Sequence, residues 1–256
     1  MSRFVEYSNL PHEADTLLIG EKYADILQFS LKKIGIQPKL IPDNPDVDER
    51  LSGHADLSVF HAGGDRIYLA PFLEGTDFHK SLSKLGADVV FPERIQNKTY
   101  PNDAQLNACS LGKSLICTPH VTADEIVNYF TNKQGTNLIL SRQGYAKCSV
   151  CVVDDSSLIT ADRGIAEAAK SNGLDVLLIN AGYIDLPGFS YGFIGGAACR
   201  LSDRLMAFTG VLDRHPDKQA ILAFIRARGF EPVFLTEKRI FDIGSAIPLT
   251  EKQSRN

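Results

Sequence analysis

Apolar residues along the chain follow two alternating patterns, one helical and one extended. In YADILQFSLKKIG and DKQAILAFIRARG they recur at i, i+3 and i+4, the spacing that places them on one face of a helix. Each such stretch ends at a glycine, which most easily adopts the positive φ found just after a helix. The pattern predicts helices over Glu21–Ile34, Leu73–Leu85, Thr122–Gln134, Ala161–Asn172 and Pro216–Arg228, followed by Gly35, Gly86, Gly135, Gly173 and Gly229 respectively.

Short apolar runs between these helices predict strands in a repeating order. The runs directly after the glycines are IQPKLI, ADVVFP, TNLILS, LDVLLI and FEPVFL. A second extended segment follows each of them: HADLSVF, NDAQLNAC, AKCSVCVV, GFIGGAA and DIGSAIP. In four units a third strand then leads into the next helix: RIYLAP, SLICTP, SLITAD and RLMAFT. The sequence therefore predicts a tandem repeat of small α/β units.

The fifth unit ends before its third strand, and the missing strand is found at the other end of the chain. DTLLIG (Asp15–Gly20) stands directly before the first helix. If this N-terminal strand completes the C-terminal unit, the repeat closes into a ring without exposed sheet edges, and the two termini lie close together. Because no linker-like tract divides the chain, we predict a single domain over residues 1–256.

Composition narrows the class of partner. The 256 residues are 44% hydrophobic and 23% charged, which is typical of a globular protein. A net charge of −4 leaves no basic surface for nucleic acid or an anionic membrane, and a small cationic ligand fits better. The first residues, MSRFVEYSNLPHEAD, do not have the pattern of a signal peptide, and the five cysteines lack disulfide-framework spacing. We therefore expect a cytoplasmic protein.

The segment SRQGYAKCSVCVV places two cysteines, Cys148 and Cys151, at the beginning of an apolar strand. One C-x-x-C pair supplies half the ligands of a zinc site, so no metal is predicted. A thioredoxin-like pair should open a helix, whereas this one continues into VCVV. We interpret Cys151 as a packed strand residue, and for Cys148 two readings remain open, a nucleophile or a small packed hydrophobic residue.

A closed ring of five ββαβ pseudo-repeats resembles the pentein fold of the guanidino-group-modifying enzymes, which include arginine deiminases, amidinotransferases and dimethylarginine hydrolases. HADLSVFHAGGDRIYLAP (His54–Pro71) is similar to the His-x-Asp segment of that family, and NDAQLNACSLGKSLICTP (Asn102–Pro119) is similar to a segment of the next unit in deiminases. The following unit of the family carries the nucleophilic cysteine behind glycines, and here it presents Gly144 and Cys148. GFIGG is also similar to a segment of bacterial proteins of this fold whose activity is not established.

The resemblance implies roles for individual residues. Cys148 would attack the electrophilic carbon of an amidinium, and His54 would protonate the departing amine or activate water. Asp56, on the same face of the predicted strand as His54, would orient the imidazole or bind substrate. Asp242 would accept paired hydrogen bonds from a planar cation. For His54, a structural histidine with a satisfied hydrogen bond is the alternative.

Three further residues are weaker candidates. Asp103 and Asn107 lie in the segment that is similar to deiminases and are candidates to bind substrate, although the satisfaction of turn and strand backbone groups is the more common role of such residues. Cys199, in GGAAC, is the second-choice nucleophile. The glycines before it are not arranged as a dinucleotide-binding loop, and we expect them to allow close backbone approach at the centre of the ring.

Two functional hypotheses follow. The first is a cysteine-dependent hydrolase or transferase that acts on a guanidino or amidino small molecule without a cofactor, with a homodimer left open. The second is a non-catalytic protein of this fold that binds a small metabolite or a protein partner, as a ribosomal anti-association factor with a similar ring does. Two departures favour the second: YGFIGGAACRLSD lacks the expected acid, and Lys147 stands beside the thiol, where it would repel a guanidinium.

Overall fold

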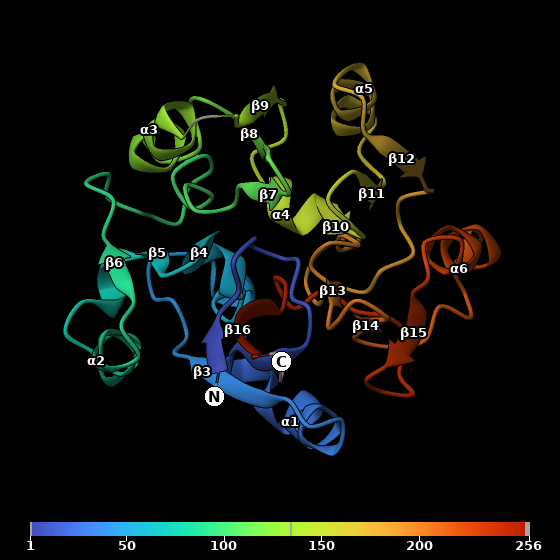
Figure 1. Cartoon of the computed structure of the whole chain (residues 1–256), viewed down its shortest axis with the longest axis horizontal. Coiled ribbons are helices and arrows are strands. Elements are labelled where there is room, and N and C mark those ends of the chain that lie inside the picture. Colours follow the sequence, from blue (N-terminus) through green and yellow to red (C-terminus); the bar gives the residue numbers. More distant parts are fainter. Residues whose placement is uncertain (1, 134, 254–256) are drawn as a thin grey trace.

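The structure, a computed structural model, describes residues 2–133 and 135–253. Within these residues the strands form five small sheets arranged in a ring, with the longer helices on the outside (Figure 1). The predicted end of the third helix, Gln134, and residues 1 and 254–256 of the predicted domain lie outside the described residues.

The five sheets share one topology, in which an inner strand runs antiparallel to a middle strand and the middle strand runs parallel to an outer strand. We number the units 1 to 5 in the order of their inner strands, β4 (Val59–Gly63), β7 (Cys109–Leu111), β10 (Val150–Val152), β13 (Ala198–Arg200) and β16 (Ile247–Lys252). The middle strands are β5 (Arg66–Leu69), β8 (Ser114–Cys117), β11 (Ser157–Thr160), β14 (Leu205–Phe208) and β2 (Ala14–Gly20). The outer strands are β6 (Asp88–Val90), β9 (Asn137–Leu140), β12 (Asp175–Leu178), β15 (Glu231–Phe234) and β3 (Gln37–Ile41).

A helix connects the middle strand of each unit to its parallel outer strand, as a parallel pair requires. These helices are, for units 1 to 5, α2 (Asp77–Lys84), α3 (Asp124–Asn132), α5 (Arg163–Ser171), α6 (Lys218–Arg226) and α1 (Ala24–Lys33). The glycines predicted to follow them all have positive φ angles, so the prediction of the helix ends is confirmed. Shorter helical turns are α4 (Ala146–Ser149), η1 (Glu21–Tyr23), η2 (Glu49–Leu51), η3 (Ala55–Leu57) and η4 (Pro71–Leu73). No helix in the described part of the chain is long and apolar enough to cross a membrane.

The ring closes through strands from both ends of the chain. β16 pairs with β2, so the N-terminal strand completes unit 5 as predicted. An additional strand, β1 (Ser2–Phe4), pairs with the other edge of β16, which places Ser2 opposite Lys252. The two ends of the chain therefore lie side by side, as Figure 1 shows.

The apolar core is divided among the interfaces between units. At one interface, Leu111 and Ile116 of unit 2 pack with Leu158 and Ile165 of unit 3. The other interfaces have the same construction, in which the sheet of one unit packs against the sheet and helix of the next. Each unit therefore buries its apolar surface only with the help of its neighbours.

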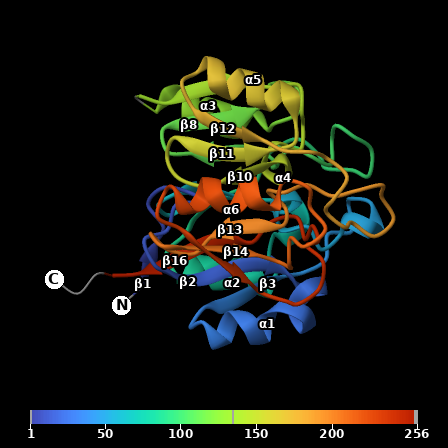
Figure 2. The ribbon, with the colours of Figure 1, turned by 90° about the vertical axis from the view of Figure 1, so that its right-hand side faces the viewer.

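The N-terminal segment after β1 crosses the centre of the ring on one face (Figure 1). Val5 N donates to Leu249 O at 3.1 Å, and Asn9 Nδ2 donates to Ser110 O at 3.0 Å. Ser8 and Asn9 are buried there. The connections from β3 to β4 and from β12 to β13 lie on the opposite face, as the side view of Figure 2 shows. The centre of the ring is thus covered on one face by the chain's own N-terminal segment.

Candidate active site

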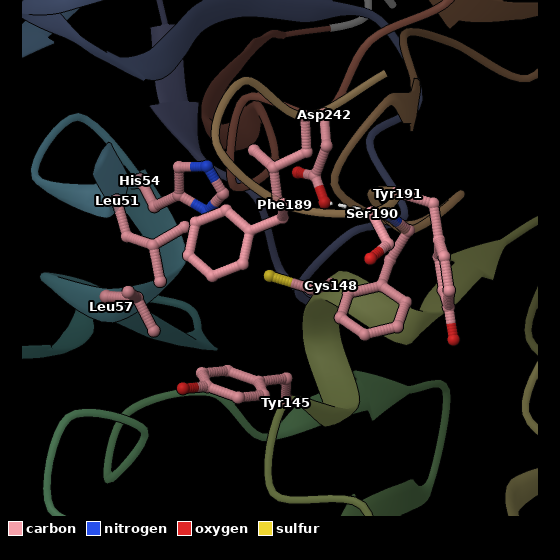
Figure 3. A pocket seen from close by; sticks show the side chains of 11 residues that line it. Leu51, His54, Leu57, Tyr145, Cys148, Phe189, Ser190, Tyr191 and Asp242 are labelled. Atoms are coloured by element: carbon pink, nitrogen blue, oxygen red, sulfur yellow. Dashed lines mark hydrogen bonds between the residues drawn. The ribbon is translucent and has the colours of Figure 1, made fainter. Parts of the chain in front are cut away.

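A pocket of about 290 Å³ is lined by residues of the β3–β4 and β12–β13 connections, which lie on the face opposite the N-terminal segment. Figure 3 shows the side chains of His54, Cys148 and Asp242 converging on this space, with Tyr145 and Phe189 beside them. The lining residues are Leu51, His54, Leu57, Tyr145, Cys148, Leu186, Phe189, Ser190, Tyr191, Phe193 and Asp242. Three of the predicted site residues therefore face one pocket, although they come from units 1, 3 and 5.

The site residues precede the inner strands instead of lying in them, which corrects the predicted strand placement. His54 comes directly before η3, Asp56 lies within it, and β4 begins only at Val59. Cys148 lies in the helical turn α4 rather than at the start of β10. Turn hydrogen bonds explain the difference, because His54 N donates to Leu51 O at 2.9 Å while Asp56 N donates to a different segment, at Gly244 O. His54 and Asp56 consequently do not share the face of a strand.

The thiol and the backbone N–H of Cys148 take part in three hydrogen bonds. Its Sγ donates to Asp56 Oδ2 at 2.9 Å and accepts from Asn107 Nδ2 at 3.3 Å, and its backbone N donates to Asn107 Oδ1 at 3.1 Å. Burial, together with the negative charges of Asp56 and Asp242, raises the pKa of the Cys148 thiol well above its usual value. In the free protein the sulfur is therefore a protonated thiol that donates to Oδ2 of Asp56.

Asn107 fixes the helical turn that carries Cys148. Its Oδ1 also accepts from Lys147 N at 2.8 Å, and its Nδ2 lies 3.5 Å from Asp56 O. Asn107 is fully buried and is not among the residues that line the pocket. These contacts give Asn107 a positioning role in the structure, and its predicted contact with substrate remains untested.

Asp56 lies beneath the cysteine, away from the pocket. Its Oδ2 also accepts from Ser245 Oγ at 2.7 Å, and Ser245 Oγ accepts from Lys147 Nζ at 3.1 Å. Asp56 and Lys147 both face a second cavity of about 10 Å³, on the side of the N-terminal segment. Burial raises the pKa of Asp56, and the neighbouring His54, the thiol of Cys148 and the charge of Lys147 oppose that shift.

His54 is a buried imidazole with free hydrogen-bonding capacity. One of its ring nitrogens, Sγ of Cys148 and a carboxylate oxygen of Asp56 all lie within 4.8 Å of one another. Its Nε2 has no hydrogen-bond partner among the described residues. Burial lowers the pKa of His54 to about 4, against the opposing charge of Asp56. The ring is therefore neutral at pH 7 and able to accept a proton.

Asp242 is the carboxylate that lines the pocket. Its Oδ2 accepts from Phe193 N and its Oδ1 from Gly244 N, both at 2.8 Å. Burial raises the pKa of Asp242 to about 6, and the two backbone N–H groups and Lys147 limit the rise. A Cβ at Gly196 would overlap Oδ1, so the glycine is needed for this close approach. The expected role of the GFIGG glycines is confirmed at this position.

Asp103 and Cys199 do not reach the pocket. Asp103 Oδ2 accepts from the hydroxyl of Tyr145 at 2.6 Å, so it positions a residue of the pocket wall. Cys199 lies in β13 and packs in the core between units 4 and 5. Burial raises the pKa of Cys199 to about 12, and the same holds for Cys151, which packs in the neighbouring core.

Sequence reasoning missed two parts of the site. Ser245 joins Lys147 to Asp56, and it does so from a backbone with φ of 71°, which the sequence SAIP does not indicate. The aromatic wall of Phe189 and Tyr191 comes from the part of the β12–β13 connection that precedes GFIGG, where no motif was recognised. The cluster of His54, Asp56 and Cys148 could also hold a metal ion, a site that the sequence did not predict.

Comparisons with known proteins agree with this architecture. Residues 18–247 match a family described as "Family of unknown function (DUF6873)". No curated protein matches the sequence. Among solved structures, the amidinotransferase SxtG from Microseira wollei has a TM-score of 0.60 at 10% identity, covering 99% of both chains. Agmatine deiminase from C. jejuni has a TM-score of 0.54 at 10% identity, covering 100% of this chain and 98% of that one. DDAH from Pseudomonas aeruginosa has a TM-score of 0.50 at 11% identity, covering 91% of this chain and 96% of that one. The likeness shows that the chain has the pentein fold.

Proposed function

The chain belongs to the family of unknown function DUF6873, and from its fold and its pocket we propose that it is a cysteine-dependent enzyme acting on a guanidino or amidino small molecule. The observation that carries the proposal is the convergence of Cys148, His54 and Asp242 on one pocket, with Asp56 bonded to the thiol beneath it. Proteins of similar structure include an amidinotransferase, a deiminase, and a cysteine-to-serine variant of DDAH complexed with citrulline, which supports this class of substrate.

The charges of the site suit a cationic substrate. Asp242 supplies a carboxylate at the pocket wall, and Asp56 places a second one under the sulfur. A guanidinium beside Cys148 would offset these charges and lower the pKa of the thiol that they raise. The substrate would thereby promote formation of the thiolate that attacks it.

The reaction then proceeds in two balanced halves. The thiol proton passes to the neutral His54, and sulfur forms a bond to the amidinium carbon. The carbon–nitrogen bond breaks, and the leaving amine takes the proton from His54, which leaves an amidino group on Cys148. Water, or an acceptor amine in a transferase, attacks the same carbon and gives a proton to His54; the carbon–sulfur bond breaks, and His54 returns that proton to the sulfur. In hydrolysis the protonated urea product then releases a proton to solvent.

The ammonium group of Lys147 faces away from the pocket in which a guanidinium would bind. The sequence indicated that its ammonium group would repel a guanidinium. In the structure, however, Nζ of Lys147 donates to Ser245 and faces the small internal cavity behind Asp56. Its charge therefore acts on the carboxylates from behind, and the pocket presents the carboxylate of Asp242 to the substrate.

Alkylation by a matched pair of reagents tests the proposal. Chloroacetamidine is cationic, and chloroacetamide is its neutral counterpart. We expect chloroacetamidine to label Cys148 at least roughly tenfold faster at pH 7.5, because only the cation is attracted by the two carboxylates. The site of labelling is read by peptide mass spectrometry.

Variants complete the test. Cys148→Ser should abolish the fast labelling, Cys199→Ser should leave it unchanged, and His54→Ala should slow it. Equal rates for the two reagents, or preferential labelling of Cys199, would contradict the proposal and favour the hypothesis of a ring that only binds.

A further inference from the structure

We propose that the substrate is an alkyl- or aryl-substituted guanidine or amidine with an uncharged, apolar far end, and not a guanidino amino acid such as arginine. This inference rests on the proposed function, and it concerns the part of the ligand that does not react. It follows from the walls of the pocket, from the charges around it and from the exposure of its rim.

The walls above the reacting groups are made of hydrocarbon. Leu51 and Leu57 come from the connection between β3 and β4, and Leu186 comes from the connection between β12 and β13. The three leucines also pack together in one buried cluster with Val47. A ligand that extends outward from Cys148 would contact these side chains, and the burial of apolar groups against them would strengthen binding.

Charge complementarity for a carboxylate is missing. Among the described residues that line the pocket, Asp242 is an acid and no lysine or arginine is present. Arg50, at the rim, is already engaged, since it bonds to the carboxylate of Asp48 at 2.7 Å and to Gly188 O at 2.7 Å. A carboxylate placed in this pocket would lose its hydration without gaining a cationic partner, which is unfavourable.

The rim presents aromatic rings that a ligand could cover. Phe189 is 38% exposed and Tyr191 is 42% exposed, and both line the pocket. Their connection is held in place, because Gly192 N donates to Ile184 O at 2.8 Å and the guanidinium of Arg50 lies 4.2 Å from the Phe189 ring centre. Two exposed rings on an anchored connection are suited to bury an apolar tail.

A competition experiment tests this specificity. The probe is chloroacetamidine, and each guanidine is measured by how well it protects Cys148 from labelling. We expect affinity to rise about three- to fourfold for each added methylene from methylguanidine to hexylguanidine. Butylguanidine and 4-guanidinobutyrate form a matched pair that differs in one terminal group, and the carboxylate compound should bind at least roughly tenfold more weakly.

Two variants test whether the pocket wall causes the preference for longer alkyl chains. Tyr191→Ala should reduce the difference between hexyl- and methylguanidine. Leu205→Ala, which changes an exposed leucine of β14 away from this pocket, should keep the wild-type difference.

The outcomes are distinguishable. If arginine or 4-guanidinobutyrate protects as well as butylguanidine, the apolar-tail inference is wrong and the proposed function stands. If no guanidine protects Cys148 and chloroacetamidine has no advantage over chloroacetamide, both are wrong.

Discussion

Burial moves the pKa values of Asp242 and His54 in opposite directions. It raises the pKa of Asp242 to about 6 and lowers that of His54 to about 4. At pH 7 the pocket therefore contains a carboxylate and a neutral imidazole. These are the protonation states needed to bind a cation and to accept a proton from a thiol.

The pH dependence of ligand binding should follow Asp242. Because its pKa is raised to about 6, the carboxylate is present above that pH and is lost as the pH falls through it. The affinity for butylguanidine should be level between about pH 6.5 and pH 8 and should decrease about tenfold per unit below pH 6. Protection of Cys148 from alkylation measures this profile.

Asp242→Asn supplies the comparison. In this variant we expect butylguanidine to bind more weakly at pH 7.5, and we expect its affinity no longer to decrease as the pH falls below about 6. Asp77→Asn, which changes a carboxylate on the exposed side of α2, should retain the wild-type profile. A wild-type profile that is flat down to pH 5 would show that Asp242 does not bind the cation.

Asp56→Asn should make the thiol more reactive toward a neutral reagent. The substitution removes a negative charge whose oxygen lies 2.9 Å from Sγ, so the pKa of Cys148 should fall toward its usual value. At pH 7.5 the rate of alkylation by iodoacetamide should rise about tenfold for each unit of that fall. Asp103→Asn is the control, because that carboxylate bonds to Tyr145 and not to the thiol. A slower reaction in Asp56→Asn would mean that Asp56 acts as the base.

At the scale of elements, the sequence predicts the repeat of helices and strands better than the conformation of the turns that precede the inner strands. Helix ends are predictable because glycines with positive φ mark them locally, as at Gly35 and Gly173. The meeting of His54 and Cys148 is also predictable, since equivalent segments of a closed ring lie around one axis. The bond between Asp56 and Ser245 is not, because it joins two turns 189 residues apart whose backbone shape no local pattern specifies.

Glycine positions in the site should be less tolerant than those at helix ends. Gly196→Ala would place a Cβ against the carboxylate of Asp242, and we expect the free energy of unfolding to fall by about 2–3 kcal/mol. Gly35→Ala meets nothing within 4 Å and has φ of 81°, so its cost should be about 1 kcal/mol. Urea unfolding compares the two. Equal losses would mean that the segment before β13 moves aside easily, and the advantage of chloroacetamidine would then survive in Gly196→Ala.

At the scale of the whole molecule, the cores between units couple the ring into one structure. Among residues 2–133 and 135–253 no unit has a core of its own, because each of the five larger clusters of buried apolar residues combines two neighbours. The pairing of β16 with β2 completes unit 5, which packs against unit 4 on one side and unit 1 on the other and so closes the ring. We therefore propose that the chain folds as one cooperative domain.

Leu18→Ala tests this coupling at the point of closure. Leu18 is fully buried in β2, in the core between units 5 and 1, and its truncation should cost about 2–4 kcal/mol. The buried cysteines report on separate units, with Cys117 in unit 2, Cys148 in unit 3 and Cys199 in unit 4. Pulsed alkylation in urea should give one midpoint for all of them, lower in the variant than in the wild type. Different midpoints for different units would contradict a single cooperative domain.

The covered mouth of the ring has a consequence for the order of events in the site. Ser8 and Asn9 are buried where the N-terminal segment covers the centre of the ring, and the pocket at Cys148 lies on the other face. Whatever enters and whatever leaves must then use the same passage. In the proposed reaction the first product would have to diffuse out before water or an acceptor amine came in, so the two reactants would be handled in turn. The lifetime of the amidino group on Cys148 would depend on how quickly that single passage is cleared.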